Sequence, residues 1–279
     1  MFDSKVIADT ISPLGKRITT LECTYPRFIH SEIMTHRDRG RNSGSSRAIP
    51  WPTMCERIEN NPVIPIYWGA EQKGMQTGGQ IDEPDLAKKI WLEARDNAID
   101  SAKRLAAIGV HKSLCNRLTE PFMWITVVMT ATNWRNFFMQ RCHQDAEIHF
   151  QKIAGMMRES ILKSTPKESM YHLPYIQDDD LDTCEPPVLA ALENDPFEVL
   201  MQVSTARCAR VSYVQHGEKA KSIKIDLGLF DRLYKGSAGG HWSPFEHPAM
   251  AIDGNSGPYR GWKGYRKLFH SECPEEGYP

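Results

Sequence analysis

The sequence predicts a helix-rich α/β (α+β) fold, built as a single domain over residues 1–279. Apolar residues make up 41% of the chain, which is enough to bury one sizeable core. A run of β-branched and apolar residues at 17–25 predicts a strand. At 85–108 apolar residues recur every three or four positions, as on one face of a helix. Strands and long helices in one chain together predict the mixed class.

The N-terminal third alternates short elements with loops. After the strand at 17–25, Pro26 suits the first turn of a short helix that we expect to end near Met34. Glycine, serine and asparagine dominate residues 38–46, which predicts a loop. Prolines and glycines also punctuate residues 51–79, so this stretch is expected to be mostly loop with short structured pieces.

The middle third predicts helices around one apolar run. A shorter helix is expected at 111–120 and a longer one at 136–163, while residues 123–130 fit either a strand or a turn of buried helix. The apolar stripe of the helix at 85–108 comprises Leu86, Ile90, Ala94, Ala98, Ala102, Leu105 and Ile108. The core positions expected on the helix at 136–163 are Phe137, Phe138, Ile148, Ile153 and Met157.

The C-terminal third begins with a change of composition. Residues 164–195 are rich in proline and acidic residues, which fits a linker or a solvated surface loop. Helices are then expected at 196–213 and 222–235, followed by a glycine-rich turn at 236–240 and a short strand after His247.

Charge and cysteine content narrow the function classes. Thirty-four Lys and Arg balance thirty-five Asp and Glu, so the whole chain does not attract nucleic acid or an anionic membrane, and anion binding has to come from local clusters. The seven cysteines are scattered, with no Cys-x-x-Cys pair, which favours reduced thiols in the cytoplasm over disulfides or a cysteine-ligated zinc site. No stretch is long and apolar enough to predict a membrane span.

Residues 35–47 concentrate the polar chemistry of the chain. They contain four arginines, one histidine, three serines and two glycines. Guanidinium groups bind phosphate through paired hydrogen bonds, and serine hydroxyls with glycine-exposed backbone amides complete an anion-binding cradle. The segment therefore favours a nucleotide phosphate site. A solvated basic loop and a nucleic-acid contact remain open on these residues alone.

The spacing within this segment resembles the signature of the flavin-dependent thymidylate synthases. In that family an Arg-His-Arg group is followed by seven residues, a serine and a nearby arginine. Here His36-Arg37 is followed by seven residues and Ser45, with Arg47 two positions further on and Asn42 also in its family place.

Three other segments resemble the same family. His241-Trp-Ser-Pro-Phe-Glu-His247 resembles its His-x-Ser-x-x-Glu-His flavin-site segment, and Ala209-Arg-Val-Ser-Tyr213 resembles the stretch before it. The run from Asn136 to Arg141 resembles the family helix that bears a substrate-facing arginine. In the family the His-x-Ser segment precedes the arginine-rich motif, whereas here it follows. This order implies a circular permutation, which predicts that residues 257–269 lie near the N-terminal strand.

The resemblance implies a reaction and a site. The reaction is transfer of a one-carbon unit to C5 of a deoxypyrimidine monophosphate, with conversion of dUMP to dTMP as the favoured case. FAD would be the cofactor, and methylenetetrahydrofolate and NADPH would be co-substrates. Arg141 would face the pyrimidine and stabilise negative charge that develops on the ring. The implied flavin contacts are His36, Arg37, Asn42, His241, Ser243, Asn133, Arg135 and Asn136. The implied nucleotide contacts are Glu32, Ser43, Ser45, Ser46, Arg47, Arg117 and Arg141.

The chain departs from the family pattern close to the implied nucleotide. Thr35 replaces the first arginine of the motif, Ser43 a glutamate, Glu32 a glutamine and Ala48 a tyrosine. Because a carboxylate accepts hydrogen bonds from an exocyclic amine, Glu32 makes dCMP an alternative substrate. A pocket that admits water to the carbon-bearing intermediate would yield a hydroxymethyl product in place of a methyl product.

Other readings of these segments stay open or are disfavoured. A zinc site of the His-x-x-Glu-His type is disfavoured because His241 and Glu246 are too far apart and Pro244 would interrupt the helix, so no metal is expected. Arg135 also fits an exposed charge on a helix, and Arg117 fits an ordinary surface ion pair. The tail at 262–266 mixes aromatic and basic residues, which also fits a non-catalytic protein that stacks on single-stranded nucleic acid. By resemblance we expect a homotetramer with sites at subunit junctions.

Overall fold

A five-stranded sheet forms the centre of the molecule. The structure is a computed structural model that describes residues 1–180, 195–211, 222–235 and 241–269. Its strands are β1 (Asp3–Ile11), β2 (Arg17–Pro26), β3 (Gly40–Ser43), β4 (Trp124–Ala131) and β5 (Lys167–Glu168), in the order β3-β4-β2-β1-β5. All neighbours are antiparallel except β5, which runs parallel to β1. The hairpin between β1 and β2 turns at Gly15, whose φ of 72° suits glycine.

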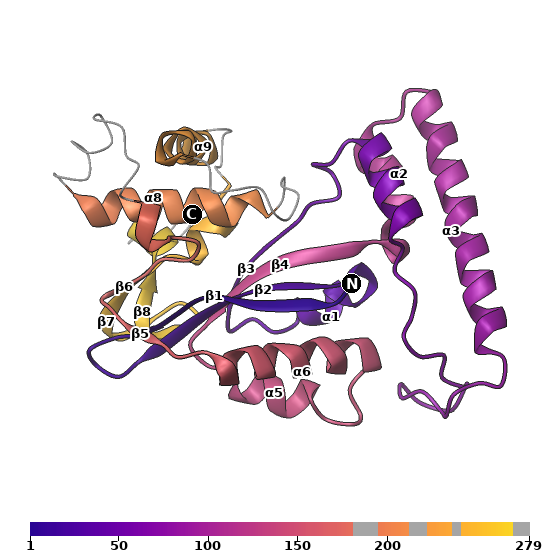
Figure 1. Cartoon of the computed structure of the whole chain (residues 1–279), viewed down its shortest axis with the longest axis horizontal. Coiled ribbons are helices and arrows are strands. Elements are labelled where there is room, and N and C mark those ends of the chain that lie inside the picture. The colour runs from indigo at the N-terminus through magenta and orange to yellow at the C-terminus, as the bar shows by residue number, and fades with distance from the viewer. Residues whose placement is uncertain (181–194, 212–221, 236–240, 270–279) are drawn as a thin grey trace, which may run out of the picture.

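Two helices cover one face of this sheet. The helices α5 (Arg135–Arg141) and α6 (Ile148–Lys163) lie along it in Figure 1. Alternate residues of β2 and β4 turn their apolar side chains toward them, as the two-residue period of a strand requires. The resulting core holds Leu21, Cys23, Tyr25, Ile125, Val127, Met129, Phe137, Phe150, Ile153 and Met157.

The chain between α5 and α6 does not continue as one helix. The backbone of α5 ends at Arg141, and α6 begins after Glu147, whose side-chain carboxylate accepts a hydrogen bond from the Phe150 amide at 2.8 Å. Such an N-cap satisfies an otherwise unpaired amide and starts a new helix. The helix expected over 136–163 is therefore two helices. Of its expected core positions Phe137, Ile153 and Met157 are buried, while Phe138 and Ile148 are half-buried.

A second sheet, with helices beside it, lies at one end of the first. Its strands are β6 (Tyr171–His172), β7 (Ala249–Ser256) and β8 (Tyr259–Gly264), and α8 (Pro196–Arg210) and α9 (Ile223–Lys235) pack nearby. The short helices here are η3 (Asp178–Asp180), η4 (Ser243–Glu246) and η5 (Tyr265–Leu268). Trp262 Nε1 of β8 donates to Lys16 O in the β1–β2 hairpin at 3.0 Å. Residues 257–269 thus meet the N-terminal strands as expected; the permutation itself stays a prediction.

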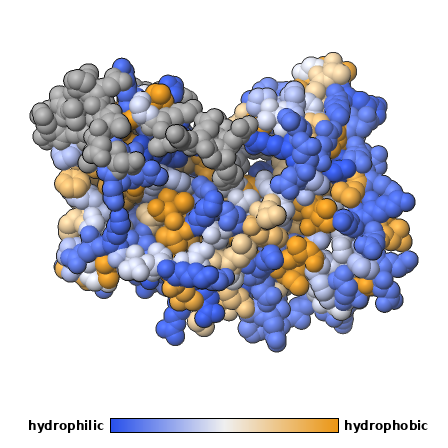
Figure 2. Space-filling view, viewed as in Figure 1, coloured by the Kyte–Doolittle hydropathy of each residue, from blue (hydrophilic) through white to orange (hydrophobic). Residues whose placement is uncertain are grey.

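At the other end stand α2 (Trp51–Asn60) and α3 (Pro84–Ala107), as Figure 1 shows. They pack with α4 (Lys112–Cys115) and η2 (Asn116–Phe122) around a separate apolar cluster. The stripe expected on α3 is only partly correct. Ala102 is buried and Ala98 and Leu105 are half-buried, but Leu86, Ile90, Ala94 and Ile108 are exposed. Ile99, outside the expected stripe, is buried. Figure 2 shows mostly hydrophilic side chains over the α3 side of the molecule, with single hydrophobic residues among them.

The remaining sequence expectations divide clearly. The strand at 17–25 and the helices at 85–108, 111–120, 196–213 and 222–235 are confirmed within a few residues. So are the strand after His247 and the short helix after Pro26, which is formed by η1 (Arg27–Ile29) and α1 (His30–Ile33). Of the two alternatives for residues 123–130, the structure has the strand, β4. The loop at 38–46 contains β3, residues 51–60 are helical, and β1 and β8 were not anticipated.

Part of the chain with a sequence expectation lies outside the described residues. In the segment 164–195, residues up to 180 include β5 and β6, and residues 181–194 are not described. The turn at 236–240 and residues 212 and 213 of the Ala-Arg-Val-Ser stretch also lie outside. Within the part of the chain that is described, no helix is long and apolar enough to span a membrane.

Candidate functional site

The two segments that carry the motifs are in direct contact. Strand β3 lies at the edge of the sheet beside β4, which brings residues 40–43 against η4. Asn42 Oδ1 accepts a hydrogen bond from Ser243 Oγ at 2.9 Å, and Asn42 Nδ2 donates to Cys208 O at 2.8 Å. The Arg41 amide donates to Glu246 Oε2 at 3.2 Å. Segments 35–47 and 241–247, far apart in the sequence, therefore form one structural unit.

This contact depends on a glycine in β3. A Cβ atom at Gly40 would lie 2.3 Å from the Tyr259 hydroxyl and 3.0 Å from Glu246 Cβ. The Tyr259 hydroxyl in turn donates to Glu246 O at 2.6 Å, and Arg266 Nη1 donates to Glu246 Oε1 at 2.6 Å. Only a residue without a side chain lets β3 approach η4 this closely.

His36 and Arg141, both expected in the site, form a pair. Arg141 Nε donates to His36 Nε2 at 2.8 Å, and the Arg141 guanidinium lies over the Phe150 ring at 4.6 Å. Burial, reinforced by the nearby charges of Arg39 and Arg141, lowers the pKa of His36 to about 4. His36 is therefore neutral at pH 7 and accepts at Nε2, which assigns its proton to Nδ1. No other hydrogen bond of Arg141 occurs among the described residues, so its terminal amino groups remain available.

Glu32 lies near this pair. Burial, and then the charge of Glu147, raise the pKa of Glu32, while the charge of Arg141 lowers it. Glu32 is half-buried, and the Arg37 side chain is exposed without a hydrogen-bond partner in the described part of the chain. Carboxylates of Glu32 and Asp38 thus lie near the pair of His36 and Arg141. That Glu32 contacts a substrate stays a prediction.

The residues expected around the start of α5 are exposed or locally bonded. Asn133 Oδ1 caps the Arg135 amide at 3.1 Å, and Asn136 Oδ1 accepts from Gln140 Nε2 at 3.3 Å. The Arg135 side chain is exposed. None of these three side chains contacts the pair of His36 and Arg141 through a hydrogen bond in the described residues.

Two buried donors next to these residues lack acceptors. The Arg39 guanidinium stacks over the rings of Phe137 and Trp134 at 4.4 and 5.0 Å and pairs with Asp38 at 2.6 Å. Its Nη1 atom and Trp134 Nε1 are buried without a hydrogen-bond partner among the described residues. Sequence reasoning did not find Arg39 or Trp134, because stacking between them joins two segments that are distant in the sequence. Unpaired buried donors are rare in folded proteins.

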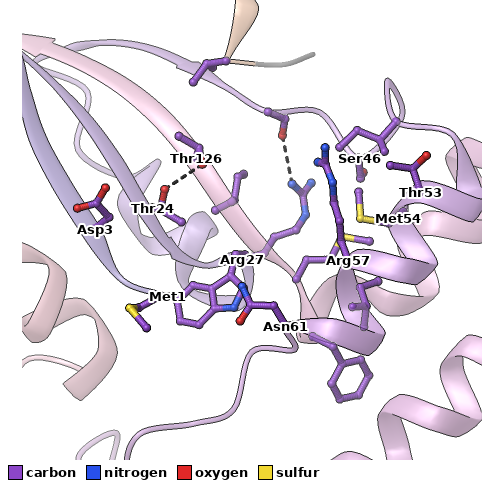
Figure 3. Close-up of a pocket in the computed structure, with 18 of the residues that line it drawn as sticks. Met1, Asp3, Thr24, Arg27, Ser46, Thr53, Met54, Arg57, Asn61 and Thr126 are labelled. Carbon is purple, nitrogen blue, oxygen red and sulfur yellow. Dashed lines mark hydrogen bonds between the residues drawn. The ribbon is translucent and has the colours of Figure 1, made fainter. Parts of the chain in front are cut away.

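Ser45 and Ser46 line a cavity of about 800 Å³ on the sheet face opposite α5 and α6. We call this cavity the sheet-face pocket (Figure 3). Its floor includes Thr24 and Thr126, whose hydroxyls are 2.9 Å apart, and one wall comes from α2. A volume of this size lies within the range of small-molecule sites.

Arg27 fixes the serine segment against the sheet-face pocket. Its Nη2 atom pairs with Glu120 Oε1 at 3.0 Å, and its Nη1 atom donates to Gly44 O at 3.5 Å. Ser46 Oγ donates to the same Glu120 Oε1 at 2.8 Å. Arg27 and Arg57, both of which line the pocket, were missed from the sequence because neither belongs to a motif.

The expected nucleotide contacts do not all meet in one chain. Arg141 belongs to α5 on one face of the sheet, whereas Ser45 and Ser46 line the pocket on the other. Arg47 is exposed and close enough to lower the pKa of His241, after burial, by its charge. Arg117 is exposed on η2 and does not line the pocket, and Ser43 is half-buried in β3.

His247 at the end of the second motif belongs to a buried hydrogen-bonded chain. Its Nδ1 atom bonds Thr130 Oγ1 at 2.8 Å, Thr130 bonds Thr20 at 2.6 Å, and Thr20 bonds His172 Nε2 at 2.7 Å. At the other end, Thr10 Oγ1 forms a hydrogen bond of 2.8 Å with the second ring nitrogen of His172, Nδ1. We call these five residues the histidine–threonine chain; it joins the two sheets.

The C-terminal tail is not a surface for stacking on bases. Trp262 and Tyr265 are 0% and 1% exposed, so their rings cannot contact nucleic acid, and Arg266 pairs with Glu246. The interpretation of residues 262–266 as a single-strand contact is therefore wrong. Among the described residues, no group of three or more His, Cys, Asp or Glu side chains could hold a metal ion.

Comparisons with known proteins add a limited similarity of fold. No family model and no curated protein matches the chain. Two crystal structures of the UMP/dUMP methylase PolB from Streptomyces cacaoi, bound with 5-Br dUMP and with 5-Br UMP, align with TM-scores of 0.46 and 0.48 at 13% identity. The alignments cover 58% of this chain and 91% and 89% of those chains. Values below 0.5 at this identity do not establish a shared function.

Proposed function

We propose that this protein uses a flavin and a folate to add a one-carbon unit to C5 of a deoxypyrimidine monophosphate, with dUMP to dTMP as the first candidate reaction. The observation that carries the proposal is the contact between segments 35–47 and 241–247, bonded through Asn42 and Ser243 at 2.9 Å. Both segments resemble flavin and nucleotide motifs of one enzyme family, and their meeting in space is what a common site requires.

Arg141 supplies a fixed positive charge for the pyrimidine. Its partner His36 is neutral, so the hydrogen bond of 2.8 Å orients the guanidinium without cancelling its charge. A carboxylate in the place of His36 would neutralise it. The free terminal amino groups of Arg141 can then stabilise negative charge on the ring as C5 becomes nucleophilic.

The residues near Arg141 fit a flavin. Arg37 and Arg135 are exposed, and their guanidinium donors have no partner in the described part of the chain. FAD offers carbonyl, ring-nitrogen and phosphate acceptors for such donors. When bound and reduced, it would supply the hydride. Asn42 and Ser243 already satisfy each other and would shape the site more than contact the cofactor.

The proposed site requires two copies of the chain. Because Arg141 and the sheet-face pocket lie on opposite faces of the sheet, one copy cannot offer both to a single nucleotide. In a homotetramer with sites at subunit junctions, Arg141 of one copy would meet the pocket of another. NADPH and methylenetetrahydrofolate would act as co-substrates at that junction.

The test is the mass of the nucleotide product. Purified protein is incubated with FAD, NADPH, methylenetetrahydrofolate and either dUMP or dCMP. A product heavier by one methyl group supports the proposal, and one heavier by a hydroxymethyl group supports its hydroxymethylating form. Arg141→Ala should abolish product formation, whereas Arg158→Ala, an exposed arginine on α6, should not. No mass change with either nucleotide would sink the proposal.

Glu32 distinguishes dUMP from dCMP. A carboxylate accepts a hydrogen bond from the exocyclic amine of cytosine, whereas a glutamine can also donate to a uracil carbonyl. Glu32→Gln should therefore raise the ratio of dUMP to dCMP turnover, measured in competition with both nucleotides present. A lower ratio would show that Glu32 does not read the base in this way.

A further inference from the structure

The cations of the sheet-face pocket differ in whether they are already paired. Lys5 pairs with Asp3 at 3.2 Å, and Arg27 pairs with Glu120 at 3.0 Å. Arg57 has no hydrogen-bond or ion-pair partner among the described residues, and its side chain is exposed. Of the Lys and Arg side chains that line this pocket, Arg57 is therefore the one with no partner among the described residues.

The helix α2 directs Arg57 into the pocket. Residues three and four apart share a helix face, and Thr53, Met54 and Arg57 all line the cavity. The α2 helix is anchored by its buried side chains Met54 and Ile58, so the position of Arg57 is set by packing. Figure 3 shows the side chains of Arg27 and Arg57 extending toward the side of the pocket where Ser46 lies.

Arg27 and Ser45 line the same pocket as Arg57, and so do the carboxylates of Asp3, which pairs with Lys5, and Glu56. Ser45, whose hydroxyl accepts only the Arg47 amide at 3.3 Å in the described part, keeps its proton for donation. Arg27 has five guanidinium hydrogens and uses two of them for Glu120 and Gly44 O. Arginine binds phosphate oxygens in pairs, and neighbouring hydroxyls complete such sites.

The pocket also has a place for a base. Trp124 and Phe122 contribute aromatic surface to its lining. Trp124 Nε1 is buried without an acceptor among the described residues. This atom is enclosed by protein and does not face the cavity, so what the pocket offers a pyrimidine ring is the aromatic surface.

We propose that the sheet-face pocket binds a nucleoside monophosphate and that Arg57 is the residue that holds its phosphate. This inference rests on the proposed function and deepens it. Arg47, which the family resemblance puts on the phosphate, is exposed beside His241 and does not line the pocket. Arg57 in α2 takes its place in the nucleotide site of this chain.

The experiment compares ligands with and without the phosphate. Affinities of the full-length protein for dUMP and for deoxyuridine are measured by calorimetry with wild type, Arg57→Ala, Arg57→Lys and Arg47→Ala. Hydrogen bonds to charged groups contribute about 1.5–3 kcal/mol, so Arg57→Ala should weaken dUMP binding roughly 10- to 100-fold and leave deoxyuridine unchanged. Arg57→Lys should recover part of the loss, because it restores the charge but not the paired geometry.

Controls separate binding from folding and from the reaction. Arg104→Ala, an arginine on α3 whose side chain is 80% exposed, should change neither affinity, and urea unfolding should show Arg57→Ala to be as stable as wild type. Equal losses for dUMP and deoxyuridine, or a loss with Arg47→Ala alone, would overturn the assignment of Arg57. The assignment of Arg57 would also be overturned if an oligonucleotide displaced dUMP and its affinity fell steeply as the salt concentration rose.

The two proposals fail in different ways. If wild type binds dUMP through Arg57 but never alters its mass, the proposed reaction is wrong and the phosphate assignment stands. If the product forms and Arg57→Ala leaves dUMP affinity unchanged, the proposed reaction stands and the assignment of Arg57 to the phosphate is wrong. If wild type binds no nucleoside monophosphate, both are overturned.

Discussion

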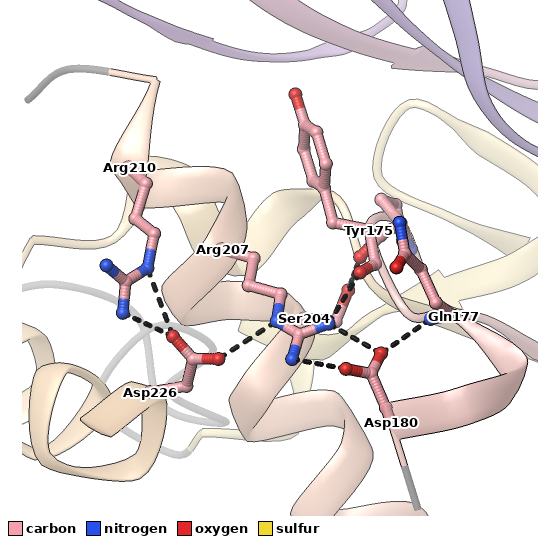
Figure 4. A network of polar contacts seen from close by, with 8 residues as sticks. Tyr175, Gln177, Asp180, Ser204, Arg207, Arg210 and Asp226 are labelled. Carbon is pink, nitrogen blue, oxygen red and sulfur yellow. Dashed lines mark hydrogen bonds and ion pairs between the residues drawn. The ribbon is translucent and has the colours of Figure 1, made fainter. Parts of the chain in front are cut away.

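Two arginine-containing regions of this protein use their charges in opposite ways. In the first, Arg207 of α8 is buried and pairs with Asp180 at 2.6 Å and with Asp226 at 2.9 Å, and Arg210 shares Asp226 (Figure 4). In the second, the sheet-face pocket, Arg57 is exposed and has no partner among the described residues. Buried charges that satisfy one another hold elements together, whereas an unpaired charge beside a cavity is available to a ligand.

The largest effect should come from breaking the buried region. Arg207→Ala removes the guanidinium that pairs with Asp180 and with Asp226. Removing one member of a buried pair destabilises a protein by about 3–5 kcal/mol. The free energy of unfolding from urea titrations measures this. Arg104→Ala, which removes an exposed contact of 3.9 Å to Asp100, should stay within about 0.5 kcal/mol of wild type. A loss below about 1 kcal/mol for Arg207→Ala would mean that water replaces the pair at little cost.

Acid should act on a buried region that carries no ion pairs, the histidine–threonine chain. Burial lowers the pKa of His172 and His247 to about 3, and that of His30 and His36 to about 4. In the unfolded chain the pKa of histidine is about 6.5. Between the lowered pKa values of the folded protein and about pH 6.5, the unfolded chain therefore binds more protons than the folded protein. The stability that these neutral histidines contribute is present above about pH 6.5 and is lost as the pH falls.

The size of the acid effect can be stated for each histidine. Lowering the pH from about 7.5 to about 5.5 should reduce the free energy of unfolding by about 1.4 kcal/mol for His172 and the same for His247, because both stay neutral in the folded protein. His247→Gln should make the pH dependence shallower by one such contribution, whatever its own effect on stability. An unchanged slope would show that the pKa of His247 is not lowered in the folded protein.

A smaller effect is expected at the contact between the two motif segments. Gly40→Ala introduces a Cβ atom 2.3 Å from the Tyr259 hydroxyl, so β3 and η4 must move apart, at a loss of about 1–3 kcal/mol. Gly228→Ala in α9 meets no atom within 4 Å and should instead stabilise by about 0.4–1 kcal/mol. If both substitutions stabilised the protein, the close approach of β3 to η4 would not be real in solution.

The sequence predicted elements better than it predicted the site, for physical reasons. Periodicity reports local packing, so the helix at 84–107 and the strand at 17–26 were found within two residues. β3 was read as a loop because its residues Gly40–Ser43 have no strand pattern and pair only through the edge of β4. The motifs identified His36, Arg141, Asn42 and Ser243, which the structure joins in two hydrogen-bonded pairs.

What the sequence missed depends on residues that are distant along the chain. Arg57 is an ordinary exposed residue of α2, and only the fold makes it line the same pocket as Ser45. Arg39 looks like one more charge in a basic loop, yet its side chain is buried against Trp134. The aromatic tail at 262–266 looked like a binding surface because composition does not report which side of a strand is buried.

The smallest effects should separate stability from binding within the pocket itself. Ser46→Ala removes a hydrogen bond of 2.8 Å to Glu120 but leaves that carboxylate paired with Arg27, so unfolding should become easier by about 0.5–1.5 kcal/mol. The Ser45 hydroxyl accepts a single long bond of 3.3 Å, so Ser45→Ala should change stability by less than about 0.5 kcal/mol. Its proton is free for a ligand, and dUMP affinity measured by calorimetry should fall more for Ser45→Ala than for Ser46→Ala. The opposite order would make the Ser46 hydroxyl, released from Glu120, the group that binds phosphate.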